Sequence, residues 1–441
     1  MTAGEKRVHH ARTIVVAAAL LAAAAVLFLG RVGTFYFDEW SFILTAPHWN
    51  LATYLQPHNE HPSILSRALY SLLLHTAGLR TYLPYLAVSV AAHVANVVLL
   101  FELVSRRAGT LVAMSAAGLL MLLGAGWDDL LWAFQMAWLM SIAFGLATLL
   151  ALQLPPTRVH LAIAATCLLL SFSFSGIGVP FAVAVAVQLG ARAETRRSLL
   201  WFVPVAIAVG AWYLLFGRFG EHPDPQPTAA NILLVPIYAA WGMSQSVAAV
   251  VGEGGWVGLG LLVLAAVALG WRWTRHGPDA FSLGVMAGLV AFYLVTGLTR
   301  AQLGIMQSGS SRYVYVGAVC WLILLADAAQ GLPWRGTWRP ALLACLFLAT
   351  FNSAVLLFSF ATARTVVMER QVADYYALEA ERTDACLNPD GVVDPLVMPS
   401  EIHPADYYAA IAAFGDPVQG RPLTDRASYE AGIRNLRRPG C

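Results

Sequence analysis

The stretch Thr13-Ile-Val-Val-Ala-Ala-Ala-Leu-Leu-Ala-Ala-Ala-Ala-Val-Leu-Phe-Leu-Gly30 runs for 18 residues without a charged side chain. A helix of that length rises about 27 Å, close to the roughly 30 Å of hydrocarbon in a bilayer. Similar uncharged runs recur at Gly109–Trp127, Leu130–Thr157, Ser198–Gly217 and Pro340–Ala363. The repetition predicts a helical protein that crosses a membrane many times.

The composition supports the same class. The 441 residues are 59% hydrophobic and 12% charged, with a mean hydropathy of +0.65. A soluble domain has about 45–50% apolar and 25% charged residues, so a soluble enzyme is excluded. The net charge is +2 and the basic residues are scattered, which excludes the continuous basic patch of a nucleic-acid binder. The absence of Walker A, GxSxG and HExxH patterns removes the usual support for ATP-driven transport and those hydrolases.

We predict an all-α bundle of about eleven membrane-spanning helices. Their expected ranges are 13–30, 82–104, 109–127, 130–153, 159–175, 177–191, 198–217, 255–271, 280–298, 313–331 and 340–363. The uncharged run Val159–Ala191 is too long for one span, and Gly176, Gly178 and Pro180 predict two short helices joined by a tight turn. The first span is longer than a signal-peptide core, so we expect it to be retained.

The basic residues predict the orientation, because Lys and Arg concentrate on the cytoplasmic side of a membrane protein. Thirteen fall on one side: Lys6, Arg7, Arg12, Arg106, Arg107, Arg158, Arg192, Arg196, Arg197, Arg272, Arg275, Arg335 and Arg339. Six precede the tail on the other side, together with most acidic residues, including Glu221, Asp224 and Glu253. The N-terminus is therefore expected in the cytoplasm. The 26 arginines beside a single lysine suggest a GC-rich bacterial genome, and so a bacterial plasma membrane.

The predicted organisation is a transmembrane domain over 1–363 and a small soluble tail over 364–441. The domain includes a first outer loop at 31–81 with juxtamembrane helices and a second at 218–254. The uncharged segment 231–252 could be a twelfth span, but its Pro236, Ser244 and Gln245 favour an interfacial or partly re-entrant helix. On the eleven-span count the tail is extracytoplasmic, where Cys386 and Cys441 could pair.

The first outer loop holds the most informative polar residues. Asp38 and Glu39 lie among the aromatic residues Phe35–Phe37 and Trp40. An apolar setting raises the pKa of a carboxylate, which suits a general base; the alternative is a solvated acidic pair. The loop continues with the outer cluster His58, Glu60 and His61, which a short helix over 62–76 is expected to hold above the bundle. Zinc binding by the two histidines lacks a clear third ligand.

Two further outer segments carry candidate site residues. Asp128 and Asp129, followed by Gln135, form a second acidic turn that could coordinate a divalent cation or seat a hydroxylated acceptor; a solvated turn is the alternative. The loop 299–313 offers hydrogen-bond donors to a phosphate through Arg300, Ser311 and Arg312. For Arg312 the alternative is a side chain that reaches to the membrane interface.

These features together resemble the GT-C fold glycosyltransferases, among them protein O-mannosyltransferases, aminoarabinose transferases and actinobacterial cell-wall glycosyltransferases. The resemblance rests on the first span, Asp38-Glu39, the element His61-Pro62 before a short helix, and the second acidic turn, and it covers about residues 13–320. The usual basic turn near the His-Pro element is replaced by His58-Asn59-Glu60-His61.

The resemblance implies an enzyme that moves a sugar from a polyprenyl-phosphate donor to a glycan, lipid or protein acceptor on the outer face. Because a base for the acceptor hydroxyl requires no covalent intermediate, we expect an inverting displacement. The resemblance also implies Asp38 as the base or acceptor-positioning carboxylate, Asp128 or Asp129 as the second-loop carboxylate, and Arg312 as a phosphate contact. We expect no obligatory metal, although Mg²⁺ or Mn²⁺ could bind if the four carboxylates assembled.

Two other classes of function stay open at the level of sequence. A transporter or flippase of lipid-linked intermediates would place ionisable residues at mid-membrane. Here most carboxylates cluster at the outer face, and Glu102, Asp279 and Asp327 lie near the cytoplasmic ends of their helices. A non-catalytic cell-envelope assembly protein is the third class.

Overall fold

The computed structural model describes residues 3–220, 228–229, 231–332, 336, 338–398 and 402–441. The predicted topology residues Glu221, Asp224 and Arg335 lie outside the described residues. In this part of the chain, nine helices are long and apolar enough to cross a membrane, or ten if a bent pair counts as one span. The chain is therefore a polytopic helical membrane protein, as predicted. The count of eleven crossings stays a prediction.

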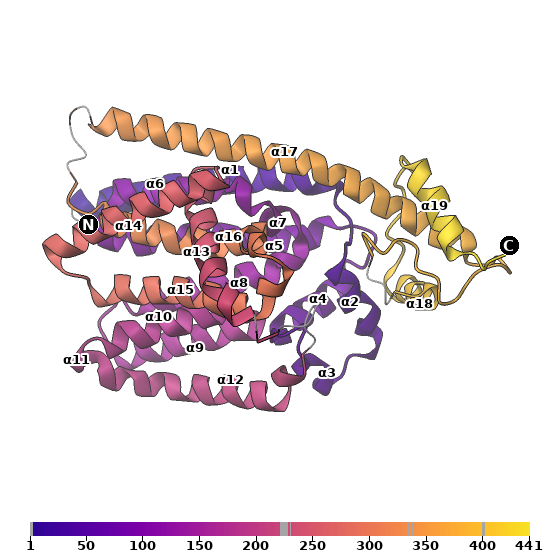
Figure 1. The fold of residues 1–441 in the computed structure, drawn as a ribbon, viewed down its shortest axis with the longest axis horizontal. Helices are drawn as coiled ribbons and strands as arrows, with labels where there is room; N and C mark the ends of the chain where they lie inside the picture. Colours follow the sequence, from indigo (N-terminus) through magenta and orange to yellow (C-terminus); the bar gives the residue numbers. More distant parts are fainter. Residues whose placement is uncertain (1–2, 221–227, 230, 333–335, 337, 399–401) are drawn as a thin grey trace.

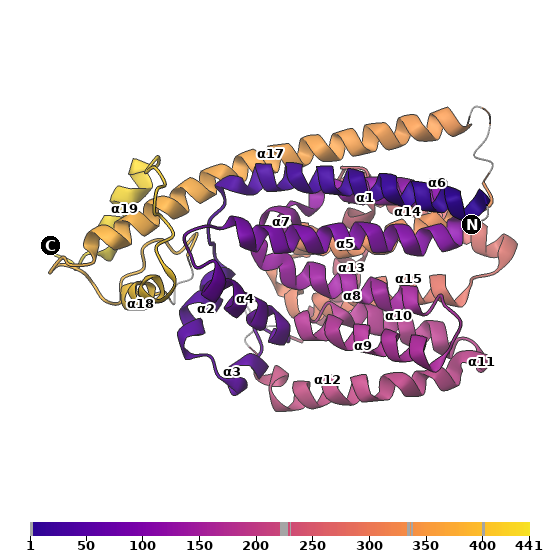
Figure 2. The ribbon, with the colours of Figure 1, turned by 180° about the vertical axis from the view of Figure 1, so that it is seen from behind.

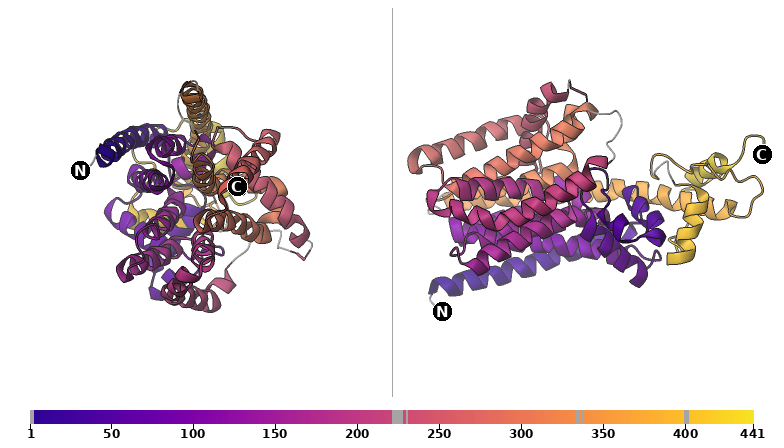
Figure 3. Two further views of the ribbon diagram at one scale, coloured as in Figure 1. Left: turned by 90° about the vertical axis from the view of Figure 1, so that its left-hand side faces the viewer. Right: turned by 90° about the horizontal axis from the view of Figure 1, so that it is seen from below.

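Most of the long helices lie side by side along the long axis of the molecule (Figures 1 and 2). They are α1 (Ala3–Leu29), α5 (Leu83–Ala108), α8 (Met136–Ala151), α9 (Arg158–Phe174), α10 (Gly178–Gly190), α12 (Val203–Leu215), α14 (Trp256–His276), α15 (Ala280–Arg300) and α16 (Ser311–Ala328). Small residues allow close packing: a Cβ on Gly284 or Gly288 of α15 would meet the backbone of α10 at 2.5 or 2.4 Å. Of the candidate spans α16 is the most deeply buried, with 89% of its most apolar window inside the protein. The end-on view shows the helices gathered into one bundle (Figure 3).

The predicted pair of short helices over 159–191 is present as α9 and α10, joined by a tight turn. The segment 109–127 differs from the single span that the sequence predicts. Instead α6 (Thr110–Met121) ends early, and α7 (Trp127–Leu131) follows after a bend of 44°. Gly124 lies against α17 (Trp338–Glu381), and its N–H donates to Ser353 Oγ at 2.9 Å. Asp128 and Asp129 therefore lie on a short helix and not in an open turn.

The ambiguous segment 231–252 contains α13 (Asn231–Ala249), which is long enough to span a membrane. Its first residue, Asn231, and Gln245 in its last two turns lie beside the connection between α15 and α16. Asn231 donates to Gln302 at 2.9 Å, and Gln245 packs against Gly309. Its second half also contacts the middle of α16, where Trp321 Nε1 donates to Met243 O at 3.0 Å. The interfacial or re-entrant placement of this helix therefore stays a prediction.

The helix ends that carry the described members of the predicted cytoplasmic set lie at the end of the bundle that holds the N-terminus (Figure 1). Arg107 pairs there with Asp279 and Asp327, and Arg272 donates to Gln330 at 3.1 Å. Glu102 accepts from Arg12 at 2.9 Å. Glu102, Asp279 and Asp327 are thus held in ion pairs at one end of the bundle.

The first outer loop folds into α2 (Asp38–Thr45), α3 (Leu51–Leu55) and α4 (Ile64–Thr76) at the opposite end of the bundle. The expected short helix over 62–76 corresponds to α4, which buries Tyr70, Leu73 and Leu74. The loop is thus a packed layer over the bundle.

The start of the tail differs from the prediction, which placed a boundary after residue 363. The last span and the start of the tail form one helix, α17, of 44 residues, which continues to Glu381. α19 (Arg426–Leu436) packs along its second half, and α18 (Pro404–Phe414) lies against α2. Cys386 and Cys441 form a disulfide with a Cα–Cα distance of 5.8 Å. The tail is therefore continuous with the membrane domain and rests on the first outer loop.

Candidate functional site

A pocket of about 240 Å³ lies between the first outer loop and the ends of the bundle helices next to that loop. Predicted residues from four separate segments line it: Asp38, His58, His61, Gln135, Arg300 and Arg312. They are far apart in the sequence, and only the fold brings them together. We treat this polar pocket as the candidate active site.

Asp38 is the first residue of α2 and follows Phe37, whose φ of 47° is rare for a residue other than glycine. Burial raises the pKa of Asp38 above its usual range, while the positive charge of Arg312 acts in the opposite direction. A desolvated carboxylate of this kind is a stronger base than an aspartate in water. The backbone conformation directs that base into the pocket.

Glu39 has a different environment from its neighbour Asp38. Its side chain is fully buried, and burial raises its pKa to about 7. The carboxylate accepts four hydrogen bonds, from Tyr70 Oη at 2.7 Å, Tyr36 N at 2.9 Å, Trp132 Nε1 at 3.1 Å and Tyr82 Oη at 3.2 Å. Glu39 does not line the pocket, so of the adjacent pair Asp38 faces the site and Glu39 braces the loop.

We expect Glu39→Gln to keep most of the stability, because an amide oxygen can accept from Tyr36 and Trp132 while its NH₂ donates to Tyr70. Glu39→Leu instead leaves the two buried N–H donors unsatisfied, at about 1–3 kcal/mol each. Thermal unfolding of the purified protein measures the difference. Equal melting temperatures for the two variants would contradict the bracing role.

The outer cluster forms a tight turn over the pocket. His58 and His61 pair through their backbones, with both N–H···O distances at 3.0 Å, and Asn59 between them has a φ of 50°. Burial lowers the pKa of His58 to about 3 and of His61 to about 4, so both rings are neutral near pH 7. Glu60 pairs with Arg300 in a two-point contact, with Nη2–Oε2 at 2.8 Å. The cluster therefore offers neutral imidazoles, and the charge of Arg300 is already matched.

The two residues of the second acidic pair have different environments. Asp128 lies within electrostatic reach of Arg312 and Arg364, and its N–H donates to Ser311 Oγ at 2.9 Å. Asp129 is fully buried, and neither carboxylate oxygen has a hydrogen-bonding partner among the described residues. Asp128 is thus the second-loop carboxylate that faces the cations, and Ser311 is used to hold α7.

Arg312 lies within electrostatic reach of two carboxylates, those of Asp38 and Asp128. Its guanidinium is 5.5 Å from the centre of the Tyr313 ring. Within the described ranges it makes no side-chain hydrogen bond and no ion pair shorter than 4 Å. Its donors are therefore available to an anion in the pocket, in contrast to those of Arg300.

Arg364 is the first residue of the predicted tail. It is 8% exposed, its guanidinium lies 5.2 Å from the Tyr36 ring centre, and its Nε and Nη2 have no hydrogen-bonding partner in the described part of the chain. Its position at the outer end of an apolar run mirrors that of Arg312 at the start of another. That pattern could have marked it as a second cation beside Asp128.

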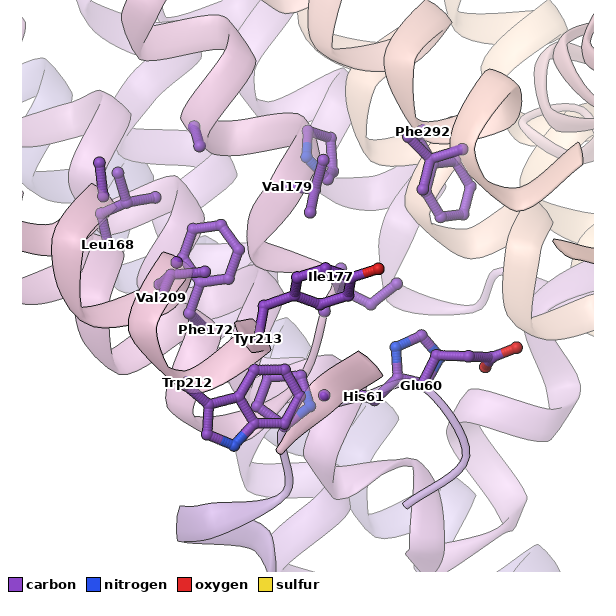
Figure 4. A pocket seen from close by; sticks show the side chains of 18 of the residues that line it. Glu60, His61, Leu168, Phe172, Ile177, Val179, Val209, Trp212, Tyr213 and Phe292 are labelled. Carbon is purple, nitrogen blue, oxygen red and sulfur yellow. The ribbon is translucent and has the colours of Figure 1, made fainter. Parts of the chain in front are cut away.

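A larger apolar cavity of about 810 Å³ adjoins the polar pocket. Its walls come from α9, α10, α12 and α15, including Phe172, Val209 and Phe292, and Glu60 and His61 lie at its edge (Figure 4). The two spaces share four lining residues, namely His61, Trp138, Arg300 and Tyr313. A large apolar cavity thus adjoins a small polar pocket beside the first outer loop.

The four carboxylates considered as a cation site do not converge, because Glu39 and Asp129 are buried away from the pocket. Among the described residues, no group of three or more His, Cys, Asp or Glu side chains is placed to hold a metal ion. In comparisons with known proteins, no family model and no curated protein matches this chain.

Proposed function

We propose that the protein is a membrane glycosyltransferase of the GT-C type, which moves a sugar from a polyprenyl-phosphate donor to an acceptor on the outer face of a bacterial plasma membrane. The observation that carries the proposal is the junction of the two spaces. A polar pocket with a basic carboxylate and an available guanidinium adjoins an apolar cavity of about 810 Å³, with four lining residues in common. A molecule with a polar head and a long apolar chain matches that shape.

The donor is held by its two chemical parts. The isoprenoid chain lies in the apolar cavity between α10, α12 and α15, and the phosphate binds Arg312. Arg300 is less suited to the phosphate because Glu60 already pairs with it. An arginine guanidinium can bind two phosphate oxygens at once, which fixes the orientation of the head group.

The reaction is a single displacement at the anomeric carbon. The acceptor hydroxyl oxygen forms a bond to that carbon as the bond from carbon to the phosphate oxygen breaks, and the electron pair leaves with the polyprenyl phosphate. Asp38 takes the proton of the acceptor hydroxyl, and Arg312 stabilises the charge that develops on the phosphate. The configuration of the sugar is inverted.

The remaining pocket residues suit recognition of a sugar. Neutral His58, His61 and Gln135 can exchange hydrogen bonds with hydroxyl groups, and the Gln135 side-chain oxygen is buried without a partner among the described residues. A pocket of about 240 Å³ is small for a ligand site, which favours transfer of one sugar residue. The chemistry uses no obligatory cofactor, and the acceptor is a glycan, a lipid or a protein. The disulfide of the tail supports an extracytoplasmic location.

The test is a transfer assay with the full chain in lipid nanodiscs. We expect radiolabelled sugar to move from one of a panel of polyprenyl-phosphate sugars to membrane extract of the host, and polyprenyl phosphate alone to raise the melting temperature. Absence of both effects would contradict the proposal. Movement of a fluorescent lipid-linked sugar across vesicles without transfer would favour the flippase alternative.

A further inference from the structure

The tail touches the backbone of the segment that leads to Asp38 at four positions. Arg421 donates from Nη2 to Gly33 O at 2.7 Å and from Nη1 to Val32 O at 3.2 Å. Tyr375 Oη donates to Phe35 O, and the N–H of Phe37 donates to Val397 O at 3.4 Å. A short stretch of the first outer loop is therefore tied to three different parts of the tail.

A second set of contacts holds the other side of Asp38. Trp40 is fully buried, and its Nε1 donates to Tyr375 Oη at 3.0 Å. Its ring centre lies 5.4 Å from that of Tyr375 and 5.5 Å from that of Tyr407. The hydroxyl of Tyr375 thus bonds to residues on both sides of Asp38.

The backbone between these contacts is strained. Phe37 has a φ of 47° and a ψ of −118°, although it carries a side chain. Such a conformation persists only where the surrounding structure holds it. The neighbours that do so include Val397, through the Phe37 N–H, and Tyr375, through the residues on either side. Asp38 follows directly, so the direction of its side chain depends on this geometry.

We propose that the tail is a clamp that positions Asp38, with Tyr375 and Arg421 as positioning residues. The Cys386–Cys441 disulfide closes the loop that contains Val397, Tyr407 and Arg421, and so keeps these clamp residues together. The consequence for reaction rate rests on the proposed glycosyltransferase function. The consequence for the loop conformation does not.

Backbone hydrogen exchange over residues 33–42, in the full chain in nanodiscs, tests the clamp without any substrate. The Trp40 amide donates to Phe37 O at 3.0 Å, so its exchange rate reports directly on the backbone conformation at Phe37. Tyr375→Phe is expected to speed its exchange roughly five- to tenfold, since a hydrogen bond is lost at each side. The matched control is Tyr408→Phe, whose hydroxyl donates to Leu378 O at 2.6 Å within the tail and which should leave exchange in 33–42 unchanged.

The transfer assay supplies the second readout. Tyr375→Phe is expected to lower kcat roughly tenfold with KM for the donor unchanged, and Arg421→Gln to act in the same direction while Arg421→Lys restores most of the rate. Unchanged exchange in both Tyr375→Phe and Arg421→Gln would overturn the clamp, and faster exchange at unchanged kcat would overturn the positioning role. If the wild-type protein transfers no sugar, the proposed function fails, and the exchange measurement still decides on the clamp.

Discussion

Asp38→Asn is expected to lower the rate of sugar transfer by about 10²–10⁴, the usual contribution of a positioned general base. The amide keeps the shape of the side chain and removes its charge, so expression and donor binding should survive. Initial rates in nanodiscs, with donor affinity measured separately, give the result. Asp406→Asn is the matched control, because Asp406 is exposed on α18 and away from the pocket.

The pH profile sharpens this test. A carboxylate acts as a base only when ionised, so transfer should fall as the pH falls through the pKa of Asp38. Since burial raises that pKa against the effect of Arg312, the acid limb is expected above the usual range for an aspartate. In the Asp38→Asn variant, the fall of transfer at acid pH should disappear together with most of the transfer rate. A variant that keeps near wild-type transfer would rule out the base and make Asp128 the next carboxylate to test.

Arg312→Gln is expected to produce the second largest effect, a decrease of about 10²–10³ in kcat. Enzymes lose about this much when one preorganised hydrogen-bond donor to a developing negative charge is removed. Binding of polyprenyl phosphate should weaken as well, because the same guanidinium holds the phosphate in the ground state. Arg312→Lys keeps the charge but loses the two-point contact, so it should recover only part of the rate.

Arg80→Gln is a suitable comparison for this variant, since Arg80 is an exposed arginine on the same side of the bundle. Donor affinity and kcat are both read from the nanodisc assay. If Arg312→Gln bound polyprenyl phosphate as tightly as the wild type and kept its rate, the phosphate contact would have to be assigned to Arg300 or Arg364.

The membrane class and the approximate helix positions could be predicted because hydrocarbon requires long apolar segments. The break after Met121 could not, since it depends on the contact of Gly124 with Ser353 in a distant helix. The hydropathy pattern also predicts that the last span ends at residue 363. The helix continues because its second half packs against α19, a tertiary interaction that a local apolar count does not detect.

At the site, residue types and their side of the membrane were predictable, whereas the direction of each side chain was not. Asp38 and Glu39 are adjacent and chemically similar, and their environments differ because α2 turns one toward the pocket and the other toward Tyr70 and Trp132. Arg364 was missed for a related reason. It lies at the end of an apolar run, and only the packing of α17 against Tyr36 reveals its burial.

The continuity of α17 changes what a deletion of the tail would remove. A cut at residue 363, where the apolar sequence ends, would sever a helix near its middle. It would take away Arg364 beside Asp128 and also Tyr375 beside Phe35. The end of the apolar sequence is thus not a boundary between two domains that could be separated. The helix that carries the last apolar run is the same helix that carries Arg364 and Tyr375, so the membrane domain and the part of the tail beside the candidate site form one structural unit.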